Sequence, residues 1–173
     1  MESKLDVTAS AKSYDLVALA DEAEEIAARL GVQAASGYVE QRLDYDTICA
    51  AVRSGDELSR RMALDVLSFW RSNDPWMEFA QCLLRDDDPV VRHQAAFQLG
   101  ASRKVHAVPA LVEALRNDSE PLVRHEAAEA LGRIGSASAL AALGEALTDE
   151  FSVVEKTARQ AIAEIHRKGS PAQ

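Results

Sequence analysis

The stretch of sequence that decides the fold is VRHQAAFQLG at residues 91–100, which returns as VRHEAAEALG at residues 123–132. The two segments lie 32 positions apart and are identical at seven of ten positions. Self-similarity at this period is typical of a solenoid, in which each short unit buries its apolar face only against its neighbours. The sequence therefore predicts a repeat architecture.

Extending the period in both directions gives four units, and two of their aligned columns are apolar throughout. These columns are Ala63, Ala95, Ala127 and Ala158, and four residues further on Leu67, Leu99, Leu131 and Ile162. Positions i and i+4 share one helical face, so we expect these columns to form the core between repeats. The segment before each column is also apolar at matched positions, with Val52 aligned to Leu84. Each unit is therefore predicted to be a two-helix hairpin, and the fold an all-α solenoid of four repeats.

Residues at the expected helix ends support this reading. Pro89 and Pro121 each open a second helix, where the missing N–H costs nothing. Asp56 and Asp88 are suited to cap helix N-termini, and Gly135 is suited to end a helix. No segment shows the strict alternation of a strand.

Residues 1–43 lie outside the repeat. An apolar stripe from Leu16 to Leu30, through Ala20, Ala23 and Ala27, predicts one amphipathic helix that Gly31 ends. We expect it to cap the first repeat, and the alternative is a dimerisation or docking helix. Residues 31–43 are predicted to be a connector, residues 44–168 the solenoid, and residues 169–173 a flexible tail; residues 1–12 are also expected to fray.

Composition narrows the class of protein. The formal net charge is −9, from 28 acidic residues against 19 Lys and Arg, which disfavours nucleic acid and favours a basic or polar protein partner. Cys49 and Cys82 lack the spacing of a metal site and suit a reducing, cytoplasmic setting. No signal peptide and no apolar run of membrane-spanning length is recognisable, so no membrane partner is expected.

The segments DPVVR at 88–92 and VRHEAAEALGRIG at 123–135 resemble HEAT-like repeats of the phycobilisome-lyase type, over roughly residues 44–168. The resemblance implies an α-solenoid. Such repeats serve in scaffolds, bilin lyases, DNA glycosylases and a di-iron hydroxylase, so the fold does not choose the function.

One aligned column reads Arg61, His93, His125 and Lys156. Equivalent helices pack about 8–10 Å apart, so the two imidazoles are predicted to reach one metal ion. Here the chain resembles one lobe of the deoxyhypusine hydroxylase family, whose paired His-Glu motifs hold two irons. His125-Glu126 matches that motif, and His93 matches it without its Glu. The resemblance implies an iron site at His93, His125 and Glu126, completed by a homodimer or a partner chain.

Three features argue against that metal site. Neighbouring residues on a helix point about 100° apart, so His125 and Glu126 are expected not to grip the same ion. Gln94 is neutral where a carboxylate is needed, and Arg61 and Lys156 place cations beside the site. We therefore assign no catalytic residue and expect no cofactor, with iron as the alternative.

The preferred interpretation is a protein-binding scaffold that uses the groove formed by the second helices. Phe69 and Phe97 are its expected anchors, because their columns otherwise hold polar residues; burial under the N-terminal segment is the alternative. Arg92 and Arg124 are predicted to bind acidic or carbonyl groups of the next unit. A lyase-type subunit that needs a partner chain to hold a tetrapyrrole is the third interpretation. The predicted groove residues are Arg61, Asp65, Phe69, His93, Phe97, His125, Glu129, Arg133 and Lys156.

Overall fold

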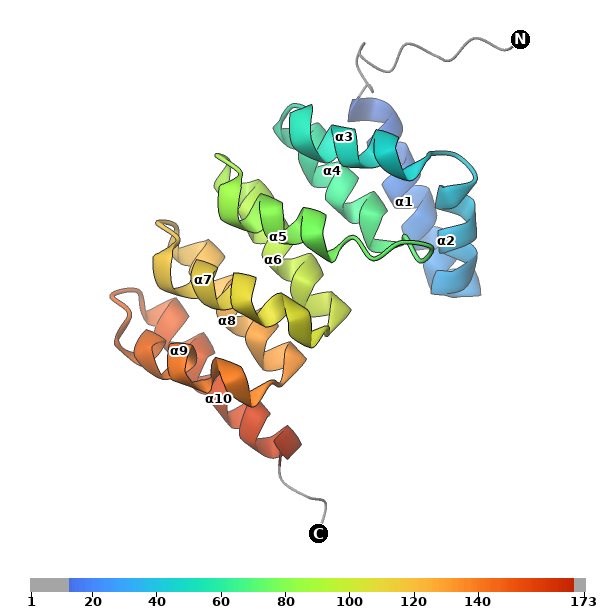
Figure 1. The fold of residues 1–173 in the computed structure, drawn as a ribbon. Coiled ribbons are helices and arrows are strands. Elements are labelled where there is room, and N and C mark those ends of the chain that lie inside the picture. Colours follow the sequence, from blue (N-terminus) through green and yellow to red (C-terminus); the bar gives the residue numbers. More distant parts are fainter. Residues whose placement is uncertain (1–12, 170–173) are drawn as a thin grey trace, which may run out of the picture. The chain divides into compact units, whose positions relative to one another are not determined.

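The structure is a computed structural model that describes residues 13–169 (Figure 1). Over this range the chain is helical and contains no strand, which confirms the all-α prediction. It forms two compact units, residues 1–78 and 79–173, which are described separately. The α-helices are α1 (Ser13–Leu30), α2 (Val32–Glu40), α3 (Tyr45–Ser54), α4 (Glu57–Ser68), α5 (Trp76–Arg85), α6 (Pro89–Ser102), α7 (Val108–Asn117), α8 (Pro121–Ile134), α9 (Leu140–Glu145) and α10 (Ser152–Gly169). Short 3-10 turns occupy Val105–Ala107, Ala137–Ala139 and Ala146–Thr148.

In the first unit, α1 packs against α2 and α4, and α3 packs against α4. Leu16, Ala20 and Ala23 of the predicted stripe are buried, and Leu19 joins them. Leu30 is 74% exposed instead of buried, because it is the last residue of α1. The contact between α1 and α4 covers the second helix of the first repeat, as a capping helix would.

The predicted connector at residues 31–43 is wrong, because most of it is the helix α2. Gly31, with φ 89°, turns the chain between α1 and α2, and Ala35, Ser36 and Val39 are buried. These three positions share one helical face, so the segment has a buried stripe that the small residues obscured. The predicted fraying of residues 1–12 and the tail beyond Gly169 lie outside the described residues.

The end of α2 is tied to the turn that follows α4. Glu40 accepts hydrogen bonds from the backbone N–H groups of Arg71 and Ser72 and from the Ser72 hydroxyl, at 2.9, 3.0 and 2.5 Å. The Ser72 hydroxyl and then these N–H groups lower the pKa of Glu40 to about 2. One charged side chain therefore holds together two segments that are 31 residues apart.

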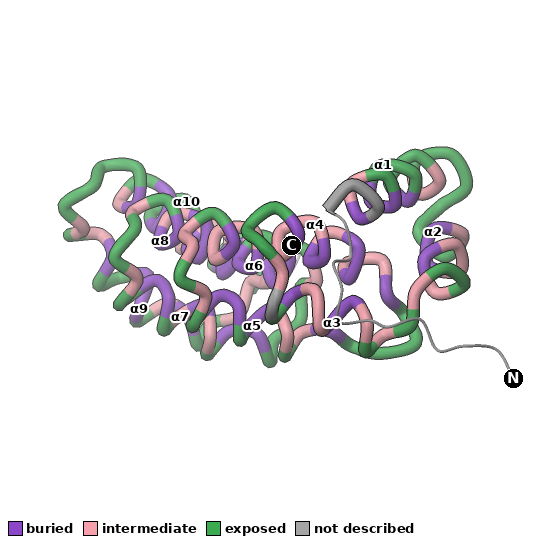
Figure 2. Tube along the Cα trace, turned by 90° about the horizontal axis from the view of Figure 1, so that it is seen from above, coloured by how far each residue is buried: buried purple, intermediate pink, exposed green. Residues whose placement is uncertain are grey.

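In the second unit the helices form two rows, with α7 and α9 in one and α6, α8 and α10 in the other (Figure 2). The predicted core columns are fully buried at Ala95, Ala127 and Ala158 and at Leu99 and Leu131. This agrees with the repeat alignment, because the same column meets the next helix in each unit. Asp88 caps α6 through the N–H groups of Val90 and Val91, and Gly135 ends α8 with φ 79°, as predicted.

Two glycines allow the second helices to approach closely. A Cβ added at Gly100 would lie 2.7 Å from the Cβ of Ala130, and one added at Gly132 would lie 3.0 Å from that of Ala161. The backbones of α6 and α8, and of α8 and α10, therefore meet at small residues. The side chains that flank these contacts are brought close to the neighbouring helix as a result.

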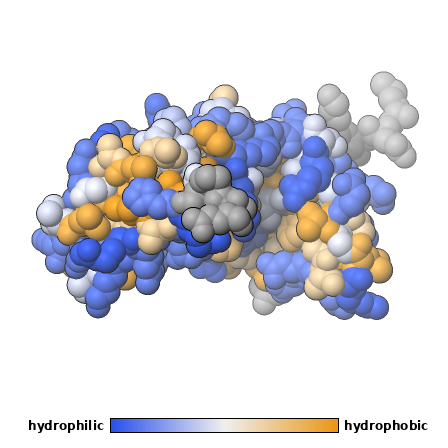
Figure 3. Space-filling model, turned by 90° about the horizontal axis from the view of Figure 1, so that it is seen from below, coloured by the Kyte–Doolittle hydropathy of each residue, from blue (hydrophilic) through white to orange (hydrophobic). Residues whose placement is uncertain are grey.

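The fourth repeat is less completely buried than the two before it. Leu147 and Ile162 are half-buried, whereas the aligned Leu115 and Leu131 are buried, because no described helix covers the far side of α9 and α10. Figure 3 views the molecule from this end and shows hydrophobic side chains gathered over the last repeat. No helix among residues 13–169 is long and apolar enough to span a bilayer.

Candidate protein-binding face

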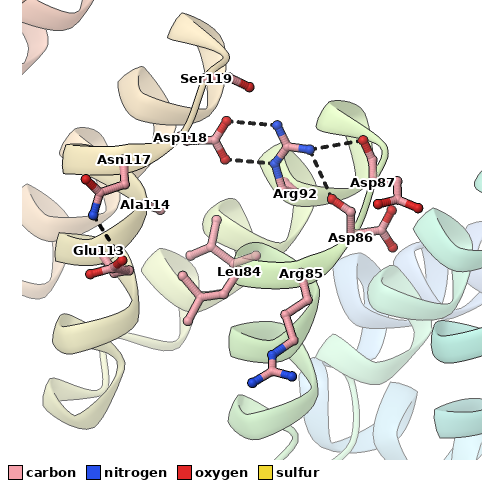
Figure 4. A pocket seen from close by; sticks show the side chains of 11 residues that line it. Leu84, Arg85, Asp86, Asp87, Arg92, Glu113, Ala114, Asn117, Asp118 and Ser119 are labelled. Carbon is pink, nitrogen blue, oxygen red and sulfur yellow. Dashed lines mark hydrogen bonds and ion pairs between the residues drawn. The ribbon is translucent and has the colours of Figure 1, made fainter.

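An arginine ladder joins the turns of successive repeats. Arg92 donates from Nε and Nη2 to Asp118 at 2.7 and 2.8 Å, and from Nη1 to the carbonyls of Asp86 and Asp87 (Figure 4). Arg124 repeats the pattern one unit later, at 2.8 and 3.0 Å from Asp149, and it donates to the carbonyl of Asp118 at 2.9 Å. The prediction that both arginines bind acceptors of the next unit is confirmed by Asp118 and Asp149, whereas the carbonyl acceptors belong to each arginine's own turn.

The ion pairs of the ladder favour the charged forms of their side chains. The hydrogen bond with Asp118 raises the pKa of Arg92, and the bond with Asp149 raises the pKa of Arg124. Arg124 in turn lowers the pKa of Asp149. Two-point binding of a carboxylate by a guanidinium sets orientation as well as energy. The ladder therefore fixes how far each second helix lies from the next.

Beside the ladder lies a hollow of about 370 Å³ between α5 and α7 (Figure 4). Leu84 and Glu113 line it, with the Arg92–Asp118 pair at its edge. Leu84 is 45% exposed, whereas its aligned residues Val52 and Leu115 are buried, so its predicted place in the core is wrong. The repeat pattern places Leu84 in an apolar column, but it does not predict the hollow between α5 and α7 that exposes this side chain.

The two histidines of the aligned column, His93 and His125, each contact the next second helix. His93 Nε2 on α6 lies 3.4 Å from Glu126 Oε2 on α8, and His125 Nδ1 shares a hydrogen bond of 2.8 Å with Thr157 Oγ1 on α10. In both cases the partner belongs to the next aligned column, which contains Glu126 and Thr157. The two imidazoles therefore lie on the same face and link successive second helices, which the sequence predicted only as a shared column.

Glu126 is the one acidic side chain of this face that is buried, at 6% side-chain exposure. Arg133 Nη1 lies 3.3 Å from Glu126 Oε1, and Arg133 Nη2 donates to Glu129 at 2.5 Å. Burial raises the pKa of Glu126, and the charges of Arg133 and His93 oppose this rise. Arg133 thus serves as the counter-charge of two carboxylates.

The candidate metal ligands come together differently from the prediction. Ligand atoms of His125, Glu126 and Glu129 lie within 4.8 Å of one another, so the expectation that His125 and Glu126 cannot reach one ion is wrong. Glu129 completes this group in place of the predicted His93. Arg133 already binds both carboxylates, however, and a dication would have to displace that guanidinium. Binding of an ion at these donors therefore requires Arg133 to move away from both carboxylates.

The exposed face of the second helices also carries an apolar row that sequence reasoning missed. Val90, Leu122 and Val153 occupy the second position of α6, α8 and α10 and are 43%, 61% and 38% exposed. Their spacing follows the repeat period, which is the signal that could have revealed them. Exposed apolar side chains that recur at the repeat period place one apolar contact on each second helix.

The other predicted groove residues divide between the two units. Phe97 is 39% exposed on α6, and the guanidinium of Arg133 lies 5.0 Å from its ring centroid. Lys156 is exposed on α10. Arg61, Asp65 and Phe69 are half-buried in the first unit, on α4 and at its C-terminal cap. The second-helix face is therefore defined here by residues of the second unit: Val90, His93, Phe97, Leu122, His125, Glu129, Arg133, Val153, Lys156 and Gln160.

Paired helices stacked in register, with a ladder along their turns, define an α-solenoid built from helical hairpins. A sequence profile of HEAT repeats matches residues 77–163, half of the chain, and the protein belongs to this family. A structure of human deoxyhypusine hydroxylase in complex with glycerol superimposes with a TM-score of 0.65 at 22% identity, over 90% of this chain. The aligned region spans 64% of that enzyme's chain, and at this identity the likeness concerns the fold. A search among curated proteins found no match.

Proposed function

We propose that the second-helix face binds a segment of a partner protein. The observation that carries this proposal is the apolar row of Val90, Leu122 and Val153, exposed on three successive helices. Phe97 adds an exposed aromatic ring beside Arg133. Aromatic and arginine side chains are the residue types most enriched among residues that dominate binding energy at protein interfaces.

The spacing of the row suits a regular segment. Neighbouring helices pack about 8–10 Å apart. A segment in the polyproline II conformation has three residues per turn and advances about 3.1 Å per residue, so every third residue faces the same side and would meet the next apolar position. A helix advances about 1.5 Å per residue, so every seventh residue would do so. A bound segment of either kind could therefore place one side chain against each repeat.

The face is held in shape before any partner arrives. The arginine ladder joins the turns, and His93–Glu126 and His125–Thr157 join the helices directly. A pre-organised surface loses less conformational entropy on binding, so modest contacts can give useful affinity.

The test compares Leu122→Glu on α8 with Leu84→Glu, which places the same charge at an exposed leucine on α5. Affinity capture from cell extract with quantitative mass spectrometry should identify proteins retained by the wild type and Leu84→Glu and lost by Leu122→Glu. Hydrogen exchange of the reconstituted complex should show protection on α6, α8 and α10. Equal capture by all three proteins, or protection confined to α7 and α9, would refute the proposal.

A metal centre at His125, Glu126 and Glu129 is the second candidate, favoured by the convergence of their ligand atoms. It requires Arg133 to leave both carboxylates, and a complete enzyme site would need a second chain. Metal analysis of native protein tests it together with thermal unfolding in added Fe(II), Mn(II) or Zn(II). A bound metal should raise the Tm of the wild type and not that of His125→Ala, since ligands stabilise the state that binds them.

A further inference from the structure

We infer that a pocket at one end of the second-helix face receives a carboxylate side chain of the bound segment. The pocket has a volume of about 240 Å³ and lies between α8 and α10. Its charged and amide-bearing lining residues are Arg103, Glu129, Arg133, Gln160, Glu164 and Lys168, and Thr157 adds a hydroxyl. This inference rests on the proposed function, since it names the chemistry that the face recognises.

The pocket offers donors that the protein itself leaves unused. Neither the guanidinium of Arg103 nor the amide of Gln160 makes a hydrogen bond or ion pair with any residue in the range 13–169. Glu129 is bound by Arg133, and Glu164 by Arg167 and Lys168. The two acidic groups at the pocket are thus already satisfied, whereas two donor groups at its rim are not.

Arg103 holds this position at a conformational cost. It ends α6 with φ 53°, and among residues 13–169 it is the only non-glycine with positive φ. The aligned residue at the end of α8 is Gly135, which adopts this left-handed conformation without strain. An arginine in place of glycine weakens the helix end and sets a cation at the mouth of the pocket. Strain of this kind is often retained where it serves a function.

Charge selects a carboxylate over a phosphate. Three cations and two carboxylates line the pocket, so one positive charge remains. A carboxylate neutralises it, whereas a phosphate with nearly two negative charges would face Glu129 and Glu164 with too little compensation. The overall charge of −9 slows the approach of an acidic segment, but screening limits that field to about 8 Å at physiological ionic strength.

The pocket adjoins Phe97, the aromatic side chain of the second-helix face. Arg133 lines the pocket and also lies over the ring of Phe97. A single segment that places an acidic residue at Arg103 therefore brings its neighbouring residues towards Phe97. The occupant we assign is a peptide segment of a partner protein with an acidic residue close to apolar ones.

The probe is a display library of random linear peptides selected against the full chain, followed by affinity measurements on synthetic copies of the enriched peptides. Enriched sequences should combine Asp or Glu with apolar residues. Arg103→Gln should weaken their binding about 10- to 100-fold, the range expected when a charged hydrogen bond is lost. Changing the peptide's acid to its amide should cost the same factor, with no further loss when both changes are combined. Arg85→Gln, an exposed arginine on α5, is the matched control and should bind like the wild type.

Arg103→Gly separates recognition from folding. It should raise Tm by about 2–4 °C by relieving the left-handed position, and weaken peptide binding as Arg103→Gln does. Peptides without acidic residues that bind Arg103→Gln like the wild type but lose binding to Leu122→Glu would overturn the carboxylate pocket and leave the proposed face intact. Selection of no peptide that distinguishes wild type from Leu122→Glu would overturn both.

Discussion

The guanidinium of Arg92 binds the carboxylate of Asp118, a residue in the turn of the next repeat, through two parallel hydrogen bonds of 2.7 and 2.8 Å. Asp118 in turn offers its carbonyl to Arg124. Each turn is thus held by the arginine of its own repeat and by that of the repeat before it. These bonds link successive turns of the solenoid, and the second-helix face is built on the helices that these turns connect.

Asp118→Ala should lower the free energy of unfolding by about 3 kcal/mol, because it leaves Arg92 buried without its counter-charge. The side chains of Arg92 and Asp118 are only 13% and 6% exposed. Urea titration followed by circular dichroism measures the change. Glu145→Ala breaks the exposed Arg116–Glu145 pair and should cost much less, because solvent screens that pair. Similar losses in the two variants would contradict the role given to the ladder.

Acid should weaken the ladder through Asp149. Its folded pKa is lowered below the ordinary value of 3.8 by Arg124, so its stabilisation is present above pH 3.8 and is lost as pH falls below that value. Asp149→Asn should show a smaller loss of unfolding free energy between pH 5 and pH 3 than the wild type. Denaturant titrations across this range provide the measurement. Parallel pH profiles for the two proteins would be incompatible with the ion pair.

Two glycine substitutions should act in opposite directions. Gly100→Ala forces a Cβ to within 2.7 Å of the Ala130 Cβ and should destabilise by about 1–3 kcal/mol, as overpacking does. Gly144→Ala lies on α9 with nothing within 4 Å of the added Cβ, and should stabilise by about 0.5–1 kcal/mol. Thermal unfolding of both variants tests the close approach of α6 and α8. A stabilised Gly100→Ala would show that this contact is absent.

Removing Arg133 should lower the free energy of unfolding at neutral pH, because the buried Glu126 then lacks its counter-charge. The folded pKa of Glu126 is already raised by burial, so its ionised form opposes folding as pH rises through that pKa. In Arg133→Met the loss of the counter-charge should steepen the decline in unfolding free energy between pH 5 and pH 7. Adding Glu126→Gln should abolish the extra slope. If the double variant keeps that slope, another group must titrate.

The contact of Glu40 with the turn after α4 can be tested by measuring the pKa of Glu40 by NMR. Titration of its side-chain carboxyl carbon should give a pKa of about 2, against 4.5 for an ordinary glutamate. Ser72→Ala removes the donor with the largest effect and should move the value towards 4.5, while Ser68→Ala on α4 should leave it unchanged. A wild-type value near 4.5 would mean that α2 is not held to the turn after α4.

Local sequence signals determined much of this architecture. The 32-residue period, the Asp88 cap and the Gly135 stop predicted the helices and their core columns, and the recurrence of Arg92 and Arg124 predicted the ladder. These features depend on contacts within one helix or between similar neighbouring repeats. The residues that make such contacts recur in each repeat, so the sequence alone reveals them. The helix α2 was not predicted, because its buried face consists of the small residues Ala35 and Ser36 together with Val39.

Only the tertiary structure decided which side chains of different columns meet. Successive second helices are staggered, so His93 faces Glu126 rather than His125, and Arg133 reaches Glu126 as well as its helical neighbour Glu129. The repeat period aligns equivalent columns, but it does not reveal which different columns meet once the helices pack closely at Gly100 and Gly132. For the same reason the exposure of Leu84 and the position of the Arg103 guanidinium at the pocket could be recognised only after the helices were placed in space.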